Sequence, residues 1–389
     1  MVSRWVILGL LFASITINLL DRQVLSVMAP LIRDELRLSN TDYSYIVFCF
    51  TLGLTLAQVP AGMWLDRRGA RFGLPAIMAV WSAANGLHAV ARSVWHFGLF
   101  RFLLGIGECG NYSAGVKVIS SRFPAEERAL AGGLFNSGTV IGAAIAPAIL
   151  VSVAGTYGWR MAFVIPSVMG LIWIVPWMIF YRDSGGRSEG FKLVRLTRQV
   201  WGVMLMRALA GPVVHFYWYW LPEYLKSERH FSMETIGMLA GLPFVCAGIG
   251  NILGGLFAGV LMKRGWSADR ARKCCFVTGG LLCGSSVLVP LAPGEGLPVA
   301  LICVATFGLA SMAANHIGLL KDLFDPRILA GVTGLTGLCE GVFNMALTLA
   351  TGRVVDAYSY GPVFVAAGAL PAMAVLCLFV LIRKVERIS

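Results

Sequence analysis

The sequence has little charge for its length. Asp, Glu, Lys and Arg make up 13% of the 389 residues, whereas soluble domains carry about 25%. Hydrophobic residues make up 57%, and the mean hydropathy is +0.75. This shortage of polar residues excludes an ordinary water-soluble protein, and no stretch is long and polar enough to form a soluble domain.

Motifs for nucleotide and metal chemistry are also absent. No Gly-x-x-x-x-Gly-Lys-Ser/Thr loop is present to hold a nucleotide phosphate, which argues against an ATP-driven pump. The nine cysteines are scattered, and the adjacent Cys274 and Cys275 have no second pair at the spacing of a metal site. We therefore expect no cofactor, no metal centre and no enzyme activity.

Acidic residues are scarcer than basic ones, at 20 against 32, which gives a formal net charge of +12. The basic residues lie in short clusters between apolar segments and not in a separate basic module. Nucleic acid is therefore not an expected partner. Orientation in a lipid bilayer explains the excess better.

Apolar stretches recur along the whole chain, each long enough to cross about 30 Å of hydrocarbon as a helix. The first, which begins at Trp5, is too long and too polar for a signal peptide. We predict an all-α membrane protein with twelve transmembrane helices, at residues 5–31, 41–64, 71–91, 95–120, 128–154, 158–181, 199–225, 232–262, 270–292, 296–322, 327–352 and 359–383.

Two repeated motifs indicate a duplicated six-helix unit. Arg128-Ala-Leu-Ala-Gly recurs as Arg327-Ile-Leu-Ala-Gly, and Gly62-x-x-x-Asp66-Arg67-x-Gly69 has a degenerate counterpart at Gly259-x-x-x-Lys263-Arg264-Gly265, at nearly the same spacing. We predict two pseudo-symmetric six-helix bundles at 1–181 and 199–389, joined by a linker at 182–198.

The basic clusters predict the orientation of the chain. Most of the 32 Lys and Arg residues fall on the side of the membrane that holds the amino terminus, for example in Arg67–Arg71, Lys263–Lys273 and the linker. Loops that stay in the cytoplasm collect positive charge. We therefore expect a monomer in the inner (cytoplasmic) membrane, with the linker and both termini in the cytoplasm.

Four ionisable residues lie deep within predicted helices, where a charge is costly unless it is paired or faces water. They are Asp21 and Arg22 in the first helix and Arg101 and Glu108 in the fourth. Arg101 and Glu108 are two turns apart, on one helix face and about 10 Å apart along the axis. Arginines can clamp an anion and neighbouring acids can take up protons. The alternative is that the four charges only neutralise one another and hold the two helices together.

Other polar positions have structural explanations beside functional ones. Lys117 and Arg207 lie nearer the cytoplasmic helix ends, where long basic side chains reach the headgroups, although they could also gate an inner exit. The aromatic run after His215, Phe216–Trp220, can stack on a sugar ring or form an interfacial belt. A lone histidine within a span, such as His215, is interpreted as a hydrogen-bonded structural residue, with a proton relay as the alternative. His316 forms a polar cluster with Ser311 and Asn315.

Several motifs resemble known transporter families. Gly62-Met-Trp-Leu-Asp66-Arg67-Arg68-Gly69 resembles the signature loop between helices 2 and 3 of the major facilitator superfamily. Three more resemble its anion:cation symporter family, namely Asn18-Leu-Leu-Asp21-Arg22-Gln-Val-Leu-Ser, Arg101-Phe-Leu-Leu-Gly-Ile-Gly-Glu108-Cys-Gly-Asn111-Tyr and Phe135-Asn136-Ser137-Gly138. Within that family, Gln58-Val-Pro-Ala-Gly, Phe123-Pro-Ala-Glu-Glu-Arg128-Ala and Tyr157-Gly-Trp-Arg160-Met-Ala-Phe are most similar to bacterial hexuronate and sugar-acid proton symporters.

The resemblance implies the major facilitator fold and uptake of an organic anion with protons by alternating access. It assigns proton coupling to Asp21 and Glu108 and anion binding to Arg22, with Arg101 as a partner of the acids or of the substrate. The sequence departs from these relatives at Leu54 in the first half and at Gly211, Met312 and Glu340 in the second half. The substrate can therefore differ from a hexuronate.

We predict proton-coupled uptake of a small organic anion, with a sugar acid of the hexuronate or aldonate class as the expected substrate. Glu340 would repel a dianion unless it is protonated, which favours a monocarboxylate. A proton-driven exporter of another small organic compound is the alternative, and Arg22 and Arg101 argue against it. Beyond the four buried charges, the residues predicted to contact the substrate are Asn136, Ser311, Asn315, Asn344 and Glu340.

Overall fold

The computed structural model describes residues 3–182 and 196–385, and within these ranges the regular structure is helical, with no β-strand. This confirms the all-α class. The predicted linker at 182–198 lies mostly outside the described residues.

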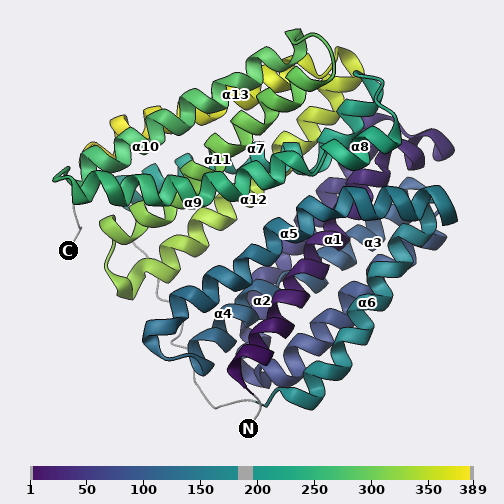
Figure 1. The fold of residues 1–389 in the computed structure, drawn as a ribbon, viewed down its shortest axis with the longest axis horizontal. Coiled ribbons are helices and arrows are strands. Elements are labelled where there is room, and N and C mark those ends of the chain that lie inside the picture. The colour runs from purple at the N-terminus through teal and green to yellow at the C-terminus, as the bar shows by residue number, and fades with distance from the viewer. Residues whose placement is uncertain (1–2, 183–195, 386–389) are drawn as a thin grey trace. The chain divides into compact units, whose positions relative to one another are not determined.

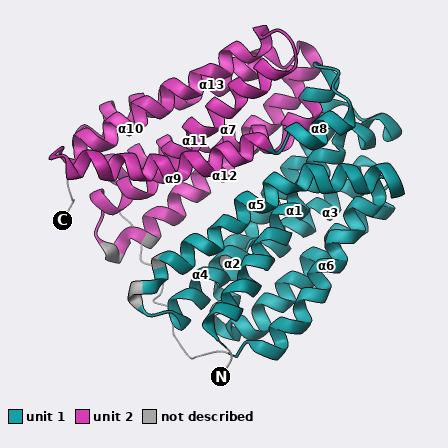
Figure 2. Ribbon diagram, in the orientation of Figure 1, with its two compact units in different colours: residues 1–189, 225–241 teal, residues 190–224, 242–389 magenta. Residues whose placement is uncertain are grey.

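The chain divides into two compact units, shown in Figure 2. Unit 1 comprises Met1–Glu189 and Leu225–Gly241, and unit 2 comprises Gly190–Tyr224 and Leu242–Ser389. The sequence places 225–241 in the carboxyl-terminal bundle, whereas its contacts group it with unit 1. The predicted bundle boundaries stay a prediction.

Unit 1 is a bundle of long helices. They are α1 (Arg4–Leu36), α2 (Asn40–Leu87), α3 (Val94–Glu108), α4 (Asn111–Arg122), α5 (Ala125–Tyr157), α6 (Trp159–Phe180) and the short α8 (Met233–Leu239), with one 3-10 turn, η1 (His88–Val90). α1 packs against α5 and α6, and α2 packs against α3 and α6 (Figure 1). This packing encloses the polar faces of α1 and α3.

α2 contains two of the predicted spans, 41–64 and 71–91. It begins with a capping box, because the Ser39 hydroxyl accepts the Asp42 N–H and the Asp42 carboxylate accepts the Ser39 N–H, each at 3.0 Å. At Gly69 the backbone leaves the helix with φ 76° and ψ 164°. A side chain is strained at such a positive φ, so the last glycine of the Gly62–Gly69 motif provides the kink between the two spans.

The predicted span 95–120 is divided into α3 and α4. Helix α3 ends at Glu108 and α4 begins at Asn111, with Cys109 and Gly110 between them. The Cys109 thiol donates to the Ile106 carbonyl at 2.9 Å. The break in the helix therefore falls directly after one of the predicted proton-coupling residues.

Unit 2 is also helical. It contains α7 (Arg198–Ser227, whose last turn belongs to unit 1), α9 (Leu242–Lys263), α10 (Ala268–Cys283), η2 (Gly284–Leu291), α11 (Gly296–Leu323), α12 (Pro326–Ala357), α13 (Gly361–Cys377) and the π-helical η3 (Leu378–Ile382). Helix α11 packs against α9 and α10, and α13 packs against α10 and η2. Polar side chains of α11 are buried by this packing.

The distribution of polarity is that of a membrane protein. Within the described residues, nine helical segments are long and apolar enough to cross a membrane. Helix α2, with two predicted spans, and the α3–α4 pair complete the twelve predicted segments. Large apolar side chains such as Trp95 and Leu281 are exposed, at 87% and 75%, whereas Asp21 and Asn315 are fully buried. Apolar surface outside and polar groups inside are expected where lipid is the solvent.

Candidate functional site

Three of the predicted intramembrane charges are enclosed in unit 1. Asp21 on α1 and Arg101 and Glu108 on α3 are each exposed by 2% or less. Arg101 and Glu108 lie on the buried side of α3, as their spacing predicts. Arg101 is close enough to Asp21 and to Glu108 to attract both electrostatically. These residues form one buried charge cluster.

Arg22, the fourth charge, forms an ion pair with Glu108. The Arg22 Nε donates to the Glu108 Oε2 at 2.5 Å and so joins α1 to α3. The Glu108 side chain is fully buried, whereas the Arg22 side chain is 19% exposed. The arginine predicted to bind the substrate is therefore held by an acid predicted to carry the proton.

Asp21 accepts a hydrogen bond from Asn85, a residue that the sequence analysis missed. The Asn85 Nδ2 lies 2.7 Å from the Asp21 Oδ1 and 3.2 Å from both the Phe163 carbonyl and the Ser167 hydroxyl of α6. Asn85 is fully buried. The signal was available, because an asparagine within an apolar run needs a partner as a charge does.

His88 adds a titratable group to the cluster and was also missed. It follows Asn85 by one turn, is fully buried, and its ring stacks on Phe163 with centroids 5.0 Å apart. Its Nδ1 lies 2.9 Å from the Ala84 carbonyl. Arg101 is close enough to act on His88 electrostatically, so this histidine belongs to the same network.

Phe50 on α2 lies beside both arginines of the cluster. The Arg22 Cζ is 5.5 Å and the Arg101 Cζ is 5.8 Å from the centroid of its ring. A guanidinium is attracted to an aromatic face within about 6 Å. Phe50 therefore stabilises both cations on the apolar side of the cluster.

Two glycines let α3 approach α2 closely. A Cβ on Gly105 would collide with the Phe50 carbonyl oxygen, and a Cβ on Gly107 would lie 2.7 Å from the Trp81 backbone nitrogen. The Gly105-Ile-Gly107-Glu108 sequence thus lets α3 pack on both spans of α2, which places Glu108 deep in unit 1.

Asn136, predicted to contact the substrate, lies on α5 and is half-buried. Its carbonyl accepts a hydrogen bond from the Thr139 hydroxyl at 2.7 Å. Among the described residues its side-chain amide makes no hydrogen bond. The amide is therefore available to a ligand, on a helix that packs against α1.

In unit 2, Arg207 on α7 is paired with Glu340 on α12. The Arg207 Nε donates to the Glu340 Oε2 at 2.6 Å. The expectation that Arg207 reaches the headgroups is wrong, because its guanidinium is held by this acid. Gly211 makes room for the pair, since a Cβ there would collide with the Glu340 carboxylate. Glu340 is neutralised by Arg207, so the argument that it repels a dianion no longer holds.

The predicted substrate residue Asn315 is engaged in packing α11. It is fully buried, and its Oδ1 accepts from the Arg272 Nη1 at 3.0 Å. Its Nδ2 donates to the carbonyls of Gly254 and Ser311, each at 3.0 Å. Both amide donors are used within the protein, so Asn315 has no donor left for a ligand.

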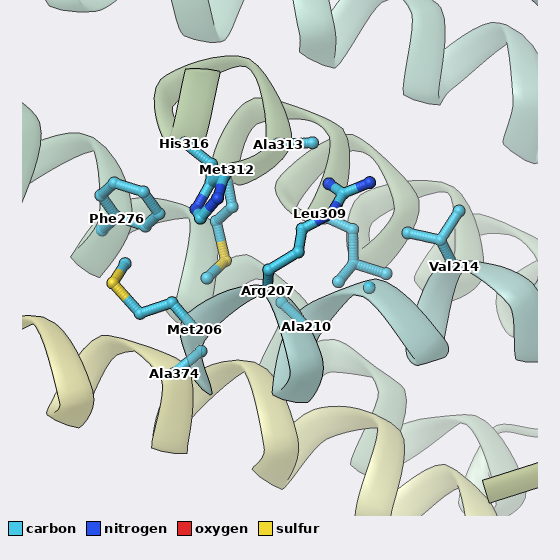
Figure 3. Close-up of a pocket in the computed structure, with 11 residues that line it drawn as sticks. Met206, Arg207, Ala210, Val214, Phe276, Leu309, Met312, Ala313, His316 and Ala374 are labelled. Atoms are coloured by element: carbon cyan, nitrogen blue, oxygen red, sulfur yellow. The ribbon is translucent and has the colours of Figure 1, made fainter. Parts of the chain in front are cut away.

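Arg207 lines a cavity of unit 2, which Figure 3 shows. It is a small cavity that opens on one side, and its enclosed part holds little more than one water molecule. Ser311, Asn315 and Asn344 do not line this cavity. Its lining includes Arg207 and His316 and a larger apolar set with Met206, Phe276, Leu309 and Met312.

The aromatic run Phe216–Trp220 packs into unit 2. Phe216 meets Phe364 of α13 edge-to-face with centroids 5.3 Å apart. The Tyr217 hydroxyl is hydrogen-bonded to the Ser286 hydroxyl at 2.6 Å. These contacts hold Phe216 and Tyr217 of α7 against α13 and η2, which favours a packing role for this part of the run.

Sequence comparison identifies the family. Residues 11–311 match the profile of the Major Facilitator Superfamily. The chain belongs to the Major Facilitator Superfamily. This confirms the resemblance seen in the loop motif at Gly62–Gly69, and the superfamily is one of transporters and not of enzymes.

Relatives of this superfamily member include transporters of sugar acids. The hexuronate transporter of Escherichia coli (strain K12) is 27% identical over 408 residues, which cover 98% of this chain and 94% of the relative. The probable L-galactonate transporter of the same strain is 29% identical over 402 residues, which cover 96% and 88%. A bacterial homologue of the human lysosomal transporter Spinster, in an inward-facing and occupied conformation, shares the fold with a TM-score of 0.83, at 18% identity and over 98% and 97% of the two chains.

Among the described residues of this superfamily member, unit 1 holds the Arg22–Glu108 pair and unit 2 holds the Arg207–Glu340 pair. Both residues of the first pair were predicted as functional candidates from the sequence. The second pair was missed because Arg207 and Glu340 are 133 residues apart, and local spacing does not report such a contact.

Proposed function

We propose that this transporter carries a sugar acid into the cell together with protons, by alternating access. The observation behind this proposal is the Arg22–Glu108 ion pair, buried in unit 1 beside Asp21. The names of the relatives, a hexuronate and a probable L-galactonate transporter, support the substrate class.

The ion pair can couple anion binding to proton uptake. A substrate carboxylate that binds Arg22 competes with the Glu108 carboxylate for the same guanidinium. Once released, the fully buried Glu108 would carry an unpaired charge in a low-dielectric interior, and taking up a proton removes that cost. Anion and proton then bind together, and neither crosses the membrane with an uncompensated buried charge.

Asp21 is proposed as a second proton site. It is fully buried, held by Asn85 and attracted by Arg101. A change in the position of Arg101 when substrate binds would alter the charge that Asp21 experiences. Arg101 is therefore proposed to link the two acids and the bound anion.

Candidate substrate contacts are proposed within each unit. Asn136 on α5 has an amide without a hydrogen bond among the described residues, and Ser311 and Asn344 remain candidates in unit 2. Asn315 is left out because both of its amide donors are used, and Glu340 is assigned first to Arg207.

The direction of transport is proposed from the distribution of charge. Basic clusters fall on the side that holds both termini, and such clusters stay in the cytoplasm. In the inner membrane of a bacterium, the inward proton gradient would then drive uptake.

The test is uptake by purified protein in proteoliposomes with an alkaline interior. D-Glucuronate, D-galacturonate and L-galactonate are compared with neutral D-glucose, with and without the pH gradient. We expect at least one sugar acid to accumulate above its external concentration only when the gradient is present. Counterflow without any gradient-driven accumulation would contradict proton coupling.

A further inference from the structure

The cavity of unit 2 has the composition of a ligand site. Helices α7, α10, α11 and α13 contribute to it, and most of its lining is apolar. Arg207 and His316 are the polar exceptions among the lining residues (Figure 3). Small-molecule sites commonly combine an apolar wall with a few convergent polar groups.

Arg207 offers paired donors at this cavity. Its Nε is bonded to Glu340, and among the described residues that is the one hydrogen bond of its guanidinium. The two Nη groups remain as donors, and the side chain is 34% exposed. A guanidinium fork matches the two oxygens of a carboxylate.

His316 supplies a second polar group. It is 6% exposed, and its Nε2 is buried with no hydrogen-bond partner within the described part of the chain. A buried ring nitrogen without a partner is unfavourable unless a ligand or water satisfies it. Figure 3 shows the imidazole directed into the cavity beside Phe276 and Met312.

The charges around the cavity define what it can accept. Arg207 and Glu340 neutralise each other, His316 lies close enough to Arg207 to be influenced by it, and the remaining lining is uncharged. His215, one turn beyond Gly211, has its Nδ1 3.2 Å from the Gly211 carbonyl. A neutral ligand can accept hydrogen bonds from the two Nη groups of Arg207, but a carboxylate accepts them in a stronger, charge-assisted and bidentate way.

We propose that Arg207 and His316 bind a carboxylate group in this cavity, with Arg207 shared between that carboxylate and Glu340. This site lies within unit 2, whereas the Arg22–Glu108 pair lies within unit 1. The inference rests on the proposed function only for the choice of a sugar acid as the ligand. The chain then recognises carboxylate in both units.

The experiment measures D-glucuronate binding to the full-length protein in nanodiscs of zwitterionic lipid, with D-glucuronamide as the neutral analogue. In the double variant Arg207→Gln, Glu340→Gln, which removes the cation without leaving an unpaired acid, we expect the Kd for D-glucuronate to rise about tenfold or more. D-Glucuronamide binding should not change. His316→Gln alone should weaken D-glucuronate binding in the same direction.

The matched control is the double variant Arg272→Gln, Asp322→Asn, which removes another Arg–acid pair of unit 2, 2.9 Å apart and away from the cavity lining. Its Kd for D-glucuronate should equal that of the parent protein. An unchanged Kd in both cavity variants, or an equal loss in the control, overturns the proposal.

A third variant distinguishes failure of the unit 2 site from failure of the proposed function. In Arg22→Gln, Glu108→Gln, proton-coupled uptake should be lost, while binding that depends on Arg207 should persist. If uptake by the parent protein does not depend on the pH gradient, the proposed function is rejected and the site in unit 2 is not affected. Loss of all D-glucuronate binding in the unit 1 variant would reject the separate site in unit 2.

Discussion

Arg22 and Glu108 form an ion pair between α1 and α3, with 2.5 Å between Nε and Oε2, in which the acid is fully buried and the arginine is partly exposed. This asymmetry matters for transport. In the proposed mechanism, the exposed Arg22 meets the substrate carboxylate, and the buried Glu108 takes up a proton when the pair separates.

Glu108→Gln is expected to uncouple transport from the proton gradient. The amide can still accept a hydrogen bond from Arg22, so helices α1 and α3 stay joined, but it cannot exchange a proton. Accumulation of D-glucuronate in proteoliposomes should fall to the equilibrium level, while counterflow of labelled against unlabelled substrate persists. The control is Glu35→Gln, which removes an exposed acid paired with Arg160 at the end of the same α1, and it should leave coupling intact. Retained gradient-driven accumulation in Glu108→Gln would show that this acid is not the proton carrier.

Arg22→Lys is expected to weaken binding of the sugar acid while leaving the fold in place. Lysine keeps the positive charge beside Glu108 but loses the planar fork that engages a carboxylate. A charged hydrogen bond contributes about 1.5–3 kcal/mol, so the Kd should rise by the corresponding factor. Titration of D-glucuronate into the purified variant measures this change, and D-glucuronamide serves as the neutral reference. If the Kd for D-glucuronate equals that of the parent protein, Arg22 does not have the proposed anion-binding role.

Gly105→Ala is expected to destabilise unit 1. The added Cβ would meet the Phe50 carbonyl oxygen, and helices α2 and α3 would have to separate, at a cost of about 1–3 kcal/mol. The matched control is Gly9→Ala in α1, where nothing lies within 4 Å of an added Cβ. That substitution should be neutral or stabilise by up to about 1 kcal/mol through helix propensity. Thermal unfolding of both variants in detergent gives the comparison, and equal melting temperatures would contradict the close packing.

Asn315→Ala is expected to lower stability, whereas Asn136→Ala is expected to weaken substrate binding. Loss of Asn315 leaves the Gly254 carbonyl and the Arg272 guanidinium with fewer partners, which should lower stability by about 1–3 kcal/mol without changing substrate preference. Loss of Asn136, whose side chain has no hydrogen bond among the described residues, should leave stability nearly unchanged and weaken sugar-acid binding. Thermal unfolding and competition between D-glucuronate and L-galactonate distinguish the two. A change of preference in Asn315→Ala would return this residue to the substrate site.

The hydrogen-bond partners of the site residues could not be predicted from the sequence. Arg207 illustrates why, because its position near a helix end favours contact with headgroups, and only the packing of α7 against α12 brings Glu340 within 2.6 Å. Asn315 illustrates the converse, because its place on a polar helix face suggested a pore-lining residue. In the structure its amide is hydrogen-bonded to the Gly254 carbonyl of α9 and to Arg272 of α10. Asn85 and His88 were overlooked for the same reason, since their importance comes from Asp21, Arg101 and Phe163 on other helices.

The amino-acid sequence is sufficient to identify a helical membrane protein of the Major Facilitator Superfamily with charges buried in its first and fourth spans. These are local properties, since bilayer thickness sets the length of an apolar run and the cost of a buried charge makes Asp21, Arg22, Arg101 and Glu108 conspicuous wherever they occur. The packing of the helices determines which of these groups come into contact. It joined Arg22 to Glu108, Asp21 to Asn85 and Arg207 to Glu340, and it opened a cavity beside His316, because such contacts depend on how helices distant in the chain pack together.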